Sequence, residues 1–550
     1  MKLKRTVVAP ALVAGVALVS GGWLLQRGVT GEQSVFQSAR IFDEVLRFVE
    51  SRYVDQHSES DLYQKALEGM LQELGDPHTS FMTADDYAQL HLQTSGEYGG
   101  LGIQIAPREG YITAVGVLPG TPAERAGIRV GDQLVEIDGK NAHGWTDDFA
   151  VKVLRGPRGT PIHLKVRRVG VDQPMEFTIV RDEIHVQSVP YAYMLAPGIG
   201  YMNLIVFSES STDEIRAAVD RLKGQGMRKL VLDLRGNPGG LLDQGVSVSD
   251  LFLRPGQSIV ETRSRNPQEN EVYRATTQET YGDLPIVVLV DGYSASAAEI
   301  VAGALQDHDR ALVVGSTTYG KGSVQSLFRL SGGNFLKMTT GKWYTPVGRS
   351  IQKPFRPGEA DGEVAAEEGT ITPEGQAVPA DTTPRRAYRT DGGRTVMGGG
   401  GIVPDVTVQP DTATDVEKEF YTAVSRHASK FNDVMLRYAV EFERRAPDLS
   451  RDFQITPAMR DELHRRLRAA GVEVTREQVE AARRLIDARL TTEIATSRFG
   501  PSVAAMRNDV NDRALQEAIR LLQRAGDQAA LFRAAEQEPP VQQRAASERR

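Results

Sequence analysis

The spacing of the hydrophobic residues changes several times along the chain, and each change marks a different kind of structure. Near the start, one apolar stripe recurs every three to four residues, which is typical of a helix that buries one face. Its members are Phe42, Val45, Leu46 and Val49. We therefore predict an N-terminal helical segment over residues 31–94. From residue 95 to residue 182, short apolar runs alternate with glycine turns, and this pattern predicts a small β-domain.

Three continuous apolar runs predict the buried strands of an α/β domain over residues 183–410. They are KLVLD, LPIVVLV and RALVVG, and a helical pattern follows the first two. Buried parallel strands joined by crossover helices have this arrangement. Residues 355–395, which are rich in Pro, Gly, Thr and acidic side chains, are predicted to be a loop insertion in this domain.

The C-terminal part of the chain has the composition of a helical extension. Ala, Arg, Glu and Leu dominate residues 411–536, and two apolar stripes have helical spacing. The stripes are Val479, Ala482, Ile486 and Leu490, and then Leu515, Ile519 and Leu522. We predict a packed helical bundle, with a partner-binding or oligomerising surface as the alternative, and a disordered tail at 537–550. The fold class is thus a multidomain α+β and α/β protein.

Residues 1–30 combine positive charge with an apolar run. Lys2, Lys4 and Arg5 precede a nearly uncharged segment of 19 residues from Val7 to Leu25. This segment is long for a signal peptide and just long enough to span a bilayer. We predict export, with an uncleaved membrane anchor favoured over a cleaved signal and over a buried core helix. The protein would then face the periplasm or another extracytoplasmic space.

Charge and cysteine content narrow the partners and the chemistry. The formal net charge is −7 over 550 residues, so no basic excess points to nucleic acid as a general partner. The sequence contains no cysteine, which excludes disulfides, thiolate metal sites and a cysteine nucleophile.

The predicted β-domain over residues 95–182 resembles a PDZ domain. The similarity lies in GGLGI, at the position of the carboxylate-binding loop, and in GTPAERAGIRVGDQLVEIDG. Successive backbone N–H groups of Leu101, Gly102 and Ile103 would form a nest for a carboxylate, and the adjacent strand edge would pair with an extended peptide. The alternative is a β-domain that only supports the rest of the fold.

The stretch from Asp291 to Gln325 holds two closely spaced serines and a lysine between glycines. Ser296 cannot pair with His308, because the two residues on one helix would be separated by about 18 Å of rise. A histidine delivered from another domain is the alternative, without local support in the sequence. Lys321 follows a neighbouring strand, and parallel strands bring their carboxyl ends to one edge of a sheet, so it can meet a serine there. Burial favours the neutral amine; lowering a lysine pKa from about 10 to about 7 corresponds to about 4 kcal/mol. The amide of Gln325 would orient this amine without adding a charge.

The same stretch, together with LDLRGNPGGLL and TPVGRSIQ, resembles the carboxyl-terminal processing peptidases over residues 35–410. These are serine peptidases with a Ser–Lys dyad and a built-in PDZ domain. In the family motif S-A-S-A-[SA]-E the second serine is the nucleophile, which corresponds to Ser296. The general base corresponds to Lys321 and the supporting glutamine to Gln325. Ser294 is then a helix-capping or packing residue.

Acyl transfer also needs hydrogen-bond donors for the oxyanion. The backbone N–H of Ala297 comes with the nucleophile, and the GNPGG turn supplies a second candidate, Gly239 or Gly240. The resemblance implies the same use of this loop. It also implies that Arg155 couples the PDZ domain to the catalytic site, with a solvated loop arginine as the alternative.

A rival of another class is the phosphate-binding loop of nucleotide hydrolases. GSTTYGKG nearly matches G-x-x-x-x-G-K-[ST], but Gly322 stands where the Mg²⁺-binding hydroxyl is needed. After Lys321, GSVQSLFRL has the pattern of a turn and a strand, whereas a phosphate-binding loop opens a helix. A nucleotide hydrolase is therefore disfavoured.

The resemblance and the residues together predict a serine endopeptidase that cleaves near the C-terminus of unfolded or tagged proteins, without metal or organic cofactor. The PDZ domain would capture a free C-terminus, and a sheet edge would bind the tail as an added strand near Ser296. Whether an adaptor protein or a homo-oligomer is needed stays open. The alternative is a non-catalytic scaffold that binds peptides through the PDZ domain.

Overall fold

The computed structural model describes residues 36–276, 281–353, 385–409 and 414–537. The chain forms two compact units, one of Met1–Thr83 with Ser326–Thr339 and one of Ala84–Gln325 with Thr340–Arg550. The anchor predicted at residues 7–25 lies outside the described residues, as does nearly all of the predicted tail. Every helix in the described ranges is too short or too polar to cross a lipid bilayer.

The smaller unit is mainly helical. A helix over 36–52, which carries the apolar stripe predicted from the sequence, precedes α2 (Glu59–Gln72). The strand β1 (Ser80–Met82) pairs antiparallel with the first residues of β18 (Phe335–Tyr344), and the Thr339 N–H donates to the Thr79 hydroxyl over 3.1 Å.

The first domain of the larger unit is an antiparallel sheet with the strand order β3-β4-β5-β7-β8, to which β6 adds beside β5. The strands are β3 (Ile103–Arg108), β4 (Tyr111–Val117), β5 (Gln133–Ile137), β6 (Lys140–Asn141), β7 (Pro161–Arg167) and β8 (Met175–Val180). The helices α4 (Pro122–Ala126) and α5 (Asp147–Leu154) belong to this domain, and β2 (Glu97–Gly100) pairs with β9 (Asp182–His185) at its boundary. Asp138 and Gly139 form the turn between β5 and β6, with φ values of 46° and 75°.

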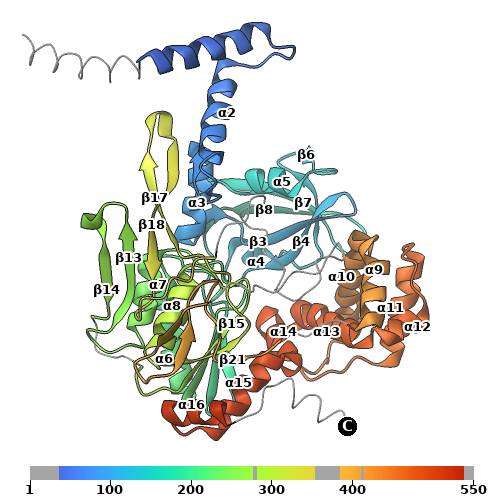
Figure 1. Cartoon of the computed structure of the whole chain (residues 1–550). Coiled ribbons are helices and arrows are strands. Elements are labelled where there is room, and N and C mark those ends of the chain that lie inside the picture. The colour runs from blue at the N-terminus through green and yellow to red at the C-terminus, as the bar shows by residue number, and fades with distance from the viewer. Residues whose placement is uncertain (1–35, 277–280, 354–384, 410–413, 538–550) are drawn as a thin grey trace, which may run out of the picture. The chain divides into compact units, whose positions relative to one another are not determined.

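The second domain is built on a six-stranded sheet with the order β10-β11-β12-β15-β16-β21, parallel except for β10. Figure 1 labels β15 and β21 of this sheet. The strands are β10 (Tyr191–Ala196), β11 (Ile199–Asn203), β12 (Lys229–Asp233), β15 (Ile286–Val290), β16 (Leu312–Gly315) and β21 (Val406–Thr407). The three strands predicted from continuous apolar runs are confirmed as β12, β15 and β16.

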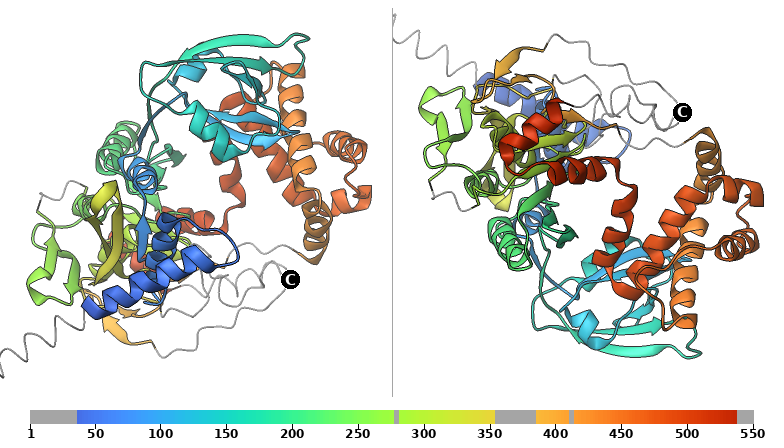
Figure 2. Two further views of the ribbon diagram at one scale, coloured as in Figure 1. Left: turned by 90° about the horizontal axis from the view of Figure 1, so that it is seen from above. Right: turned by 90° about the horizontal axis from the view of Figure 1, so that it is seen from below.

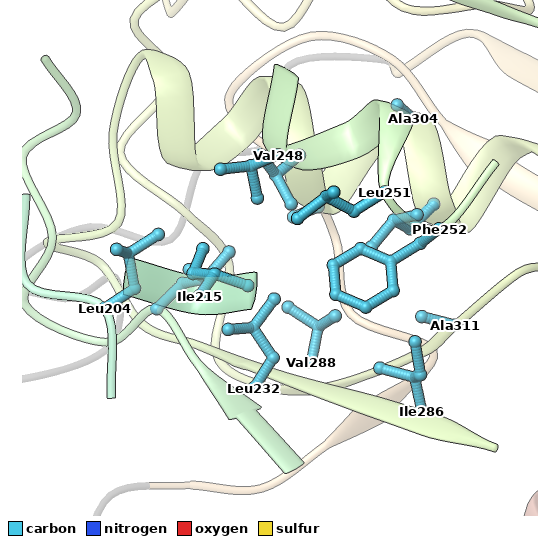
Figure 3. Close-up of a cluster of buried hydrophobic side chains, with 14 of the residues drawn as sticks. Leu204, Ile215, Leu232, Val248, Leu251, Phe252, Ile286, Val288, Ala304 and Ala311 are labelled. Atoms are coloured by element: carbon cyan, nitrogen blue, oxygen red, sulfur yellow. The ribbon is translucent and has the colours of Figure 1, made fainter. Parts of the chain in front are cut away.

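The two faces of this sheet are covered by helices from different parts of the chain. One face packs against α6 (Ser211–Gly224), α7 (Leu242–Asp250) and α8 (Ala297–Asp307). Leu232, Ile286 and Val288 point into this core, beside Leu251 and Phe252 (Figure 3). A strand buried on both faces needs apolar residues at every position, which explains the continuous runs.

The opposite face of the sheet packs against the last two helices, α15 (Arg513–Arg524) and α16 (Gln528–Glu536). Val231, Val287 and Leu289 form this core with Leu515 and Leu522 of α15. Figure 2 shows both helices, in red, against the strands of the domain in the view from below. The second predicted C-terminal stripe is therefore buried on the α/β sheet itself.

The remaining C-terminal helices form a separate bundle. They are α9 (Asp415–Ser425), α10 (Ala428–Arg445), α11 (Pro457–Ala469), α12 (Arg476–Ala481), α13 (Arg483–Phe499) and α14 (Pro501–Asn508), and the short helix η3 (Asp509–Asn511) follows them. All four residues of the first predicted stripe are buried in the core of this bundle.

The prediction that residues 355–395 form a loop is wrong for the stretch that the structure describes, residues 385–395. Residues 385–395 contain β19 (Ala387–Arg389) and lead into β20 (Thr395–Met397), which pair antiparallel. The buried side chain of Val396 gives this hairpin an apolar anchor. The rest of the insertion, residues 355–384, lies outside the described residues. The multidomain α/β fold class is confirmed.

Candidate active site

Ser296 lies at the N-cap of α8, directly after the loop that leaves β15. Its backbone has φ 54° and ψ −116°, a conformation that non-glycine residues rarely adopt and that costs on the order of 1–3 kcal/mol. Ala295 and Ala297 on either side are buried, whereas Ser296 is only partly buried. Strain at one accessible serine between buried neighbours is a common sign of a functional residue.

Ser294 is fully buried, and its hydroxyl donates to the carbonyl oxygen of Leu234 over 2.8 Å while it accepts the Asp291 N–H at 3.0 Å. These bonds tie the end of the strand to the next turn. The packing role expected for Ser294 fits this geometry, but the helix cap is Ser296.

The GNPGG turn lies against Ser296. A Cβ atom added to Gly239 would lie 2.7 Å from the Cβ of Ser296 and 3.0 Å from the N of Ala297, so only glycine fits here. The N–H of Gly239 donates to the side-chain oxygen of Asn237 over 2.8 Å. The N–H groups of Gly240 and Ala297 find no acceptor among the residues that the structure describes. Of the two predicted glycines, Gly240 is therefore the one with an amide available for a ligand.

Asn237 is a site residue that the sequence analysis missed. Its buried side chain donates to the carbonyl of Leu204 over 2.7 Å, and its own carbonyl accepts the N–H of Ala295 at 2.9 Å. Asn237 thus fastens the glycine turn to the turn that carries Ser296. Only its place inside GNPGG pointed to it in the sequence.

Glu299, one turn into α8, is the second residue that was missed. Its carboxylate is fully buried, and one oxygen, Oε2, accepts the backbone N–H of Ser296 and that of Lys321, each over 2.9 Å. The other oxygen accepts the Thr318 hydroxyl at 2.5 Å and the Gly320 N–H at 2.7 Å. The Ser-x-x-Glu spacing of a capping box was the signal in the sequence.

Burial raises the pKa of Glu299 to about 7, although the hydrogen bonds from Thr318 and from the amides of Lys321, Gly320 and Ser296 act in the opposite direction. A carboxyl group with a pKa of about 7 changes between the neutral and the ionised form near neutral pH.

The same Glu299 oxygen accepts the backbone amides of Ser296 and Lys321, so the structure brings these two stretches of backbone together. The carbonyl of Lys321 also accepts the indole N–H of buried Trp343 over 3.1 Å. Gln325 lies on β17 (Ser323–Arg329) and donates from Nε2 to the Ser323 hydroxyl over 2.9 Å.

Both rival arrangements disagree with the structure. His308 ends α8, eleven helical residues after Ser296, and its ring nitrogens contact Asp391 and the carbonyl of Ser258, each at 2.7 Å. The segment after Lys321 forms the strand β17, as predicted, so no helix N-terminus is available there for a phosphate.

The predicted carboxylate nest lies just before β3. Gly102 has φ 80°, and a Cβ atom at this residue would lie 2.3 Å from the Cβ of Thr121, so the tight turn requires glycine. The N–H groups of Leu101 and Gly102 have no acceptor within the described ranges. Ile103 opens β3, which pairs only with β4 among the described strands and so leaves one edge for an added peptide strand.

Arg155 is the C-cap residue of α5 in the same domain. Its guanidinium carbon lies 4.7 Å from the ring centre of Tyr98, and its Nη1 donates to the side-chain oxygen of Gln89 in α3 (Ala84–Ser95) over 3.3 Å. Arg155 thus joins three segments at the boundary of the β-domain.

Three family descriptions match parts of this chain: peptidase family S41 at residues 198–359, the PDZ domain at 113–168, and the activating protease CtpB N-terminal domain at 25–86. The carboxy-terminal-processing protease of Bartonella bacilliformis is 42% identical over 351 residues, covering 62% of this chain and 79% of that protein.

The carboxy-terminal processing protease CtpA of Bacillus subtilis is 35% identical over 328 residues, covering 59% of this chain and 70% of that protein. Among solved structures, the photosystem II D1 C-terminal processing protease has 29% identity and a TM-score of 0.34, covering 56% of this chain and 89% of that one. The identity to the bacterial relatives and the share of their length that is covered settle the family. This chain belongs to the carboxy-terminal processing proteases of peptidase family S41 and is a serine-type peptidase with a PDZ domain.

Proposed function

We propose that Ser296 is the nucleophile of this peptidase and Lys321 its general base. The main support is that one oxygen of Glu299 accepts the backbone N–H groups of both residues, which holds the nucleophile and the base at the same edge of the sheet. Gln325 would orient the lysine side chain.

The reaction follows from these positions. Ser296 Oγ attacks the scissile carbonyl carbon while neutral Lys321 takes the hydroxyl proton. The amides of Ala297 and Gly240 donate to the oxyanion. Ala297 follows Ser296, Gly240 follows the glycine that packs against Ser296, and both amides lack an acceptor among the described residues. Protonated Lys321 then gives its proton to the leaving amine, and water releases the acyl group from Ser296.

The PDZ domain would select the substrate by binding its C-terminus. We propose that the amides of Leu101, Gly102 and Ile103 bind the free carboxylate of an unfolded or tagged protein, and that the open edge of β3 pairs with its tail. Arg155 is proposed to couple peptide binding by the PDZ domain to the catalytic site, because it contacts both Tyr98 and Gln89.

The proposed location is the periplasm or another extracytoplasmic space, with residues 7–25 as a membrane anchor, because a positive segment precedes this apolar run. Cleavage by the purified protein alone would show that no adaptor is required.

The decisive test is the cleavage of a disordered peptide with a free C-terminus, followed by mass spectrometry. The wild type should cut it, while Ser296→Ala, Lys321→Ala and Lys321→Arg should not, since a guanidinium does not accept a proton at these pH values. Uncut peptide with the wild type, together with binding to the PDZ domain, would favour the non-catalytic scaffold. Strong activity of Lys321→Arg would contradict the lysine base.

A further inference from the structure

Asp512, the N-cap residue of α15, links the C-terminal extension to the start of a catalytic loop. One carboxylate oxygen accepts the N–H of Leu515 over 3.0 Å, which is the capping bond. The other lies 2.7 Å from Nη2 of Arg235, in the α/β domain. Asp512 therefore has two separable functions, the helix cap and the ion pair.

Arg235 is the residue at which the strand β12 turns into the glycine loop. Its guanidinium also holds Asp233, with Nε at 2.9 Å from Oδ1 and Nη2 at 2.6 Å from Oδ2. Asp233 is buried and accepts the Tyr201 hydroxyl over 2.9 Å. One guanidinium thus bridges a buried carboxylate of the sheet and a carboxylate of the C-terminal extension.

A second contact of the extension lies close to this ion pair. Asp509 in η3 accepts the hydroxyl of Tyr193 over 2.6 Å, and the Tyr193 ring centre lies 5.0 Å from that of Tyr201. The segment from Asp509 to Asp512 therefore attaches at two points to the side chains that surround Asp233.

The loop that begins at Arg235 ends at the proposed oxyanion donor. The N–H of Gly236 donates to Asp291 over 3.0 Å, and the following residues run directly to Gly240. Arg235 and Asp512 line a cavity of about 1070 Å³ together with Asp291 and Tyr293 from the loop that carries Ser296. A shift of Arg235 would thus be passed to both catalytic loops.

We propose that Asp512 is a positioning residue for the peptidase reaction: through Arg235 it holds the 236–240 loop at the distance that the oxyanion requires. The inference rests on the proposed function of Gly240 and Ser296. Without the Asp512 carboxylate, Arg235 keeps its two bonds to Asp233 but loses its ion pair with the C-terminal extension. Small errors in the position of a reacting group cost large factors in rate.

The experiment uses the full-length protein and separates the two functions of Asp512. Asparagine is as good an N-cap as aspartate, so Asp512→Asn keeps the cap and removes the negative charge that faces Arg235. The matched control is Asp527→Asn at the N-cap of α16, whose carboxylate accepts the Ala530 N–H over 2.7 Å in the same way. We would measure kcat and KM on a disordered peptide, the thermal midpoint, and amide hydrogen exchange of residues 236–240.

We expect Asp512→Asn to lower kcat about tenfold with KM nearly unchanged, to leave the thermal midpoint near that of the wild type, and to accelerate exchange in the loop. Asp512→Glu should recover part of kcat, and Asp527→Asn should match the wild type. Tyr193→Phe, which keeps the ring and loses the bond to Asp509, should accelerate exchange in the same loop.

The proposal is overturned if Asp512→Asn and Tyr193→Phe both leave kcat and loop exchange at wild-type values, because Asp512 would then only cap α15. An inactive wild type would contradict the proposed function instead. In that case the exchange data alone still decide whether Asp512 fixes the loop.

Discussion

The backbone amides of Ser296 and Lys321 donate to the same carboxylate oxygen, Oε2 of Glu299, each over 2.9 Å. The two residues come from different strand ends, and their spacing therefore depends on one buried side chain. A serine and a lysine must be held within hydrogen-bond reach for proton transfer, so a buried carboxylate with four donors is a stiff support for the pair.

Replacing Glu299 with glutamine should disrupt this support. The amide has only one oxygen, so its NH₂ group must face either the two catalytic amides or Thr318 and Gly320, and one pair of donors loses its acceptor. Each buried donor left without a partner costs about 1–3 kcal/mol. We expect kcat to fall about a hundredfold.

Glu176→Gln, on an exposed side chain of β8, is the control and should leave the rate unchanged. Wild-type kcat in Glu299→Gln would show that the carboxylate does not position the pair.

The pKa of Glu299 also predicts a dependence of stability on pH. Because the folded-state pKa is raised from 4.5 to about 7, the protonated form favours folding. The contribution of Glu299 is fully present below pH 4.5 and is lost as the pH rises through 7, by about 3 kcal/mol in total. Glutamine does not titrate, so the unfolding free energy of the wild type minus that of Glu299→Gln should decrease over this window. Urea unfolding at several pH values measures it, and a difference that stays constant from pH 4.5 to 8 would contradict the prediction.

The elements that carry the site could be predicted from the sequence because their signals are local. A continuous apolar run that ends in glycines defines β12 and β15, and the Ala-rich segment after Ser296 defines α8. The rule that parallel strands share a carboxyl edge then places the glycine turn next to Ser296.

The contacts that hold the site could not be predicted, because their partners are distant in the chain. The Ser-x-x-Glu spacing indicates that Glu299 caps α8, but its bonds to Thr318 and Lys321 depend on how β16 packs beside β15. Similarly, the stripe on α15 shows that the helix is buried but not what covers it. The sheet face that α15 covers is fixed only by tertiary packing.

Gly240→Ala should remove an oxyanion donor without unfolding the protein. Gly240 has φ 144°, and a Cβ atom there would lie 2.1 Å from the carbonyl oxygen of Phe207, so the backbone of the turn must move. Loss of one oxyanion donor typically lowers kcat by about a hundredfold to a thousandfold. We expect such a loss in kcat with KM little changed.

The matched control for this variant is Gly226→Ala, which has a positive φ of 93° but open space around the added atom. It carries the same kind of backbone strain outside the site and should keep the wild-type kcat. Equal kcat values for both variants would remove Gly240 from the oxyanion site.

Gly102→Ala should weaken the capture of the substrate and leave the chemical step intact. Its added Cβ would collide with Thr121, at 2.3 Å, and would displace the amides of the proposed carboxylate nest. For a substrate with a free C-terminus we expect KM to rise about tenfold at unchanged kcat, because only binding that is common to ground and transition state is lost. A substrate with an amidated C-terminus should show the raised KM already with the wild type, and Gly102→Ala should not raise it further.

Gly139→Ala, at φ 75° with nothing near the added atom, controls for backbone strain in the same domain. If the amidated and free substrates have equal KM values with the wild type, the nest does not read the terminal carboxylate, and the open edge of β3 alone would have to select the tail.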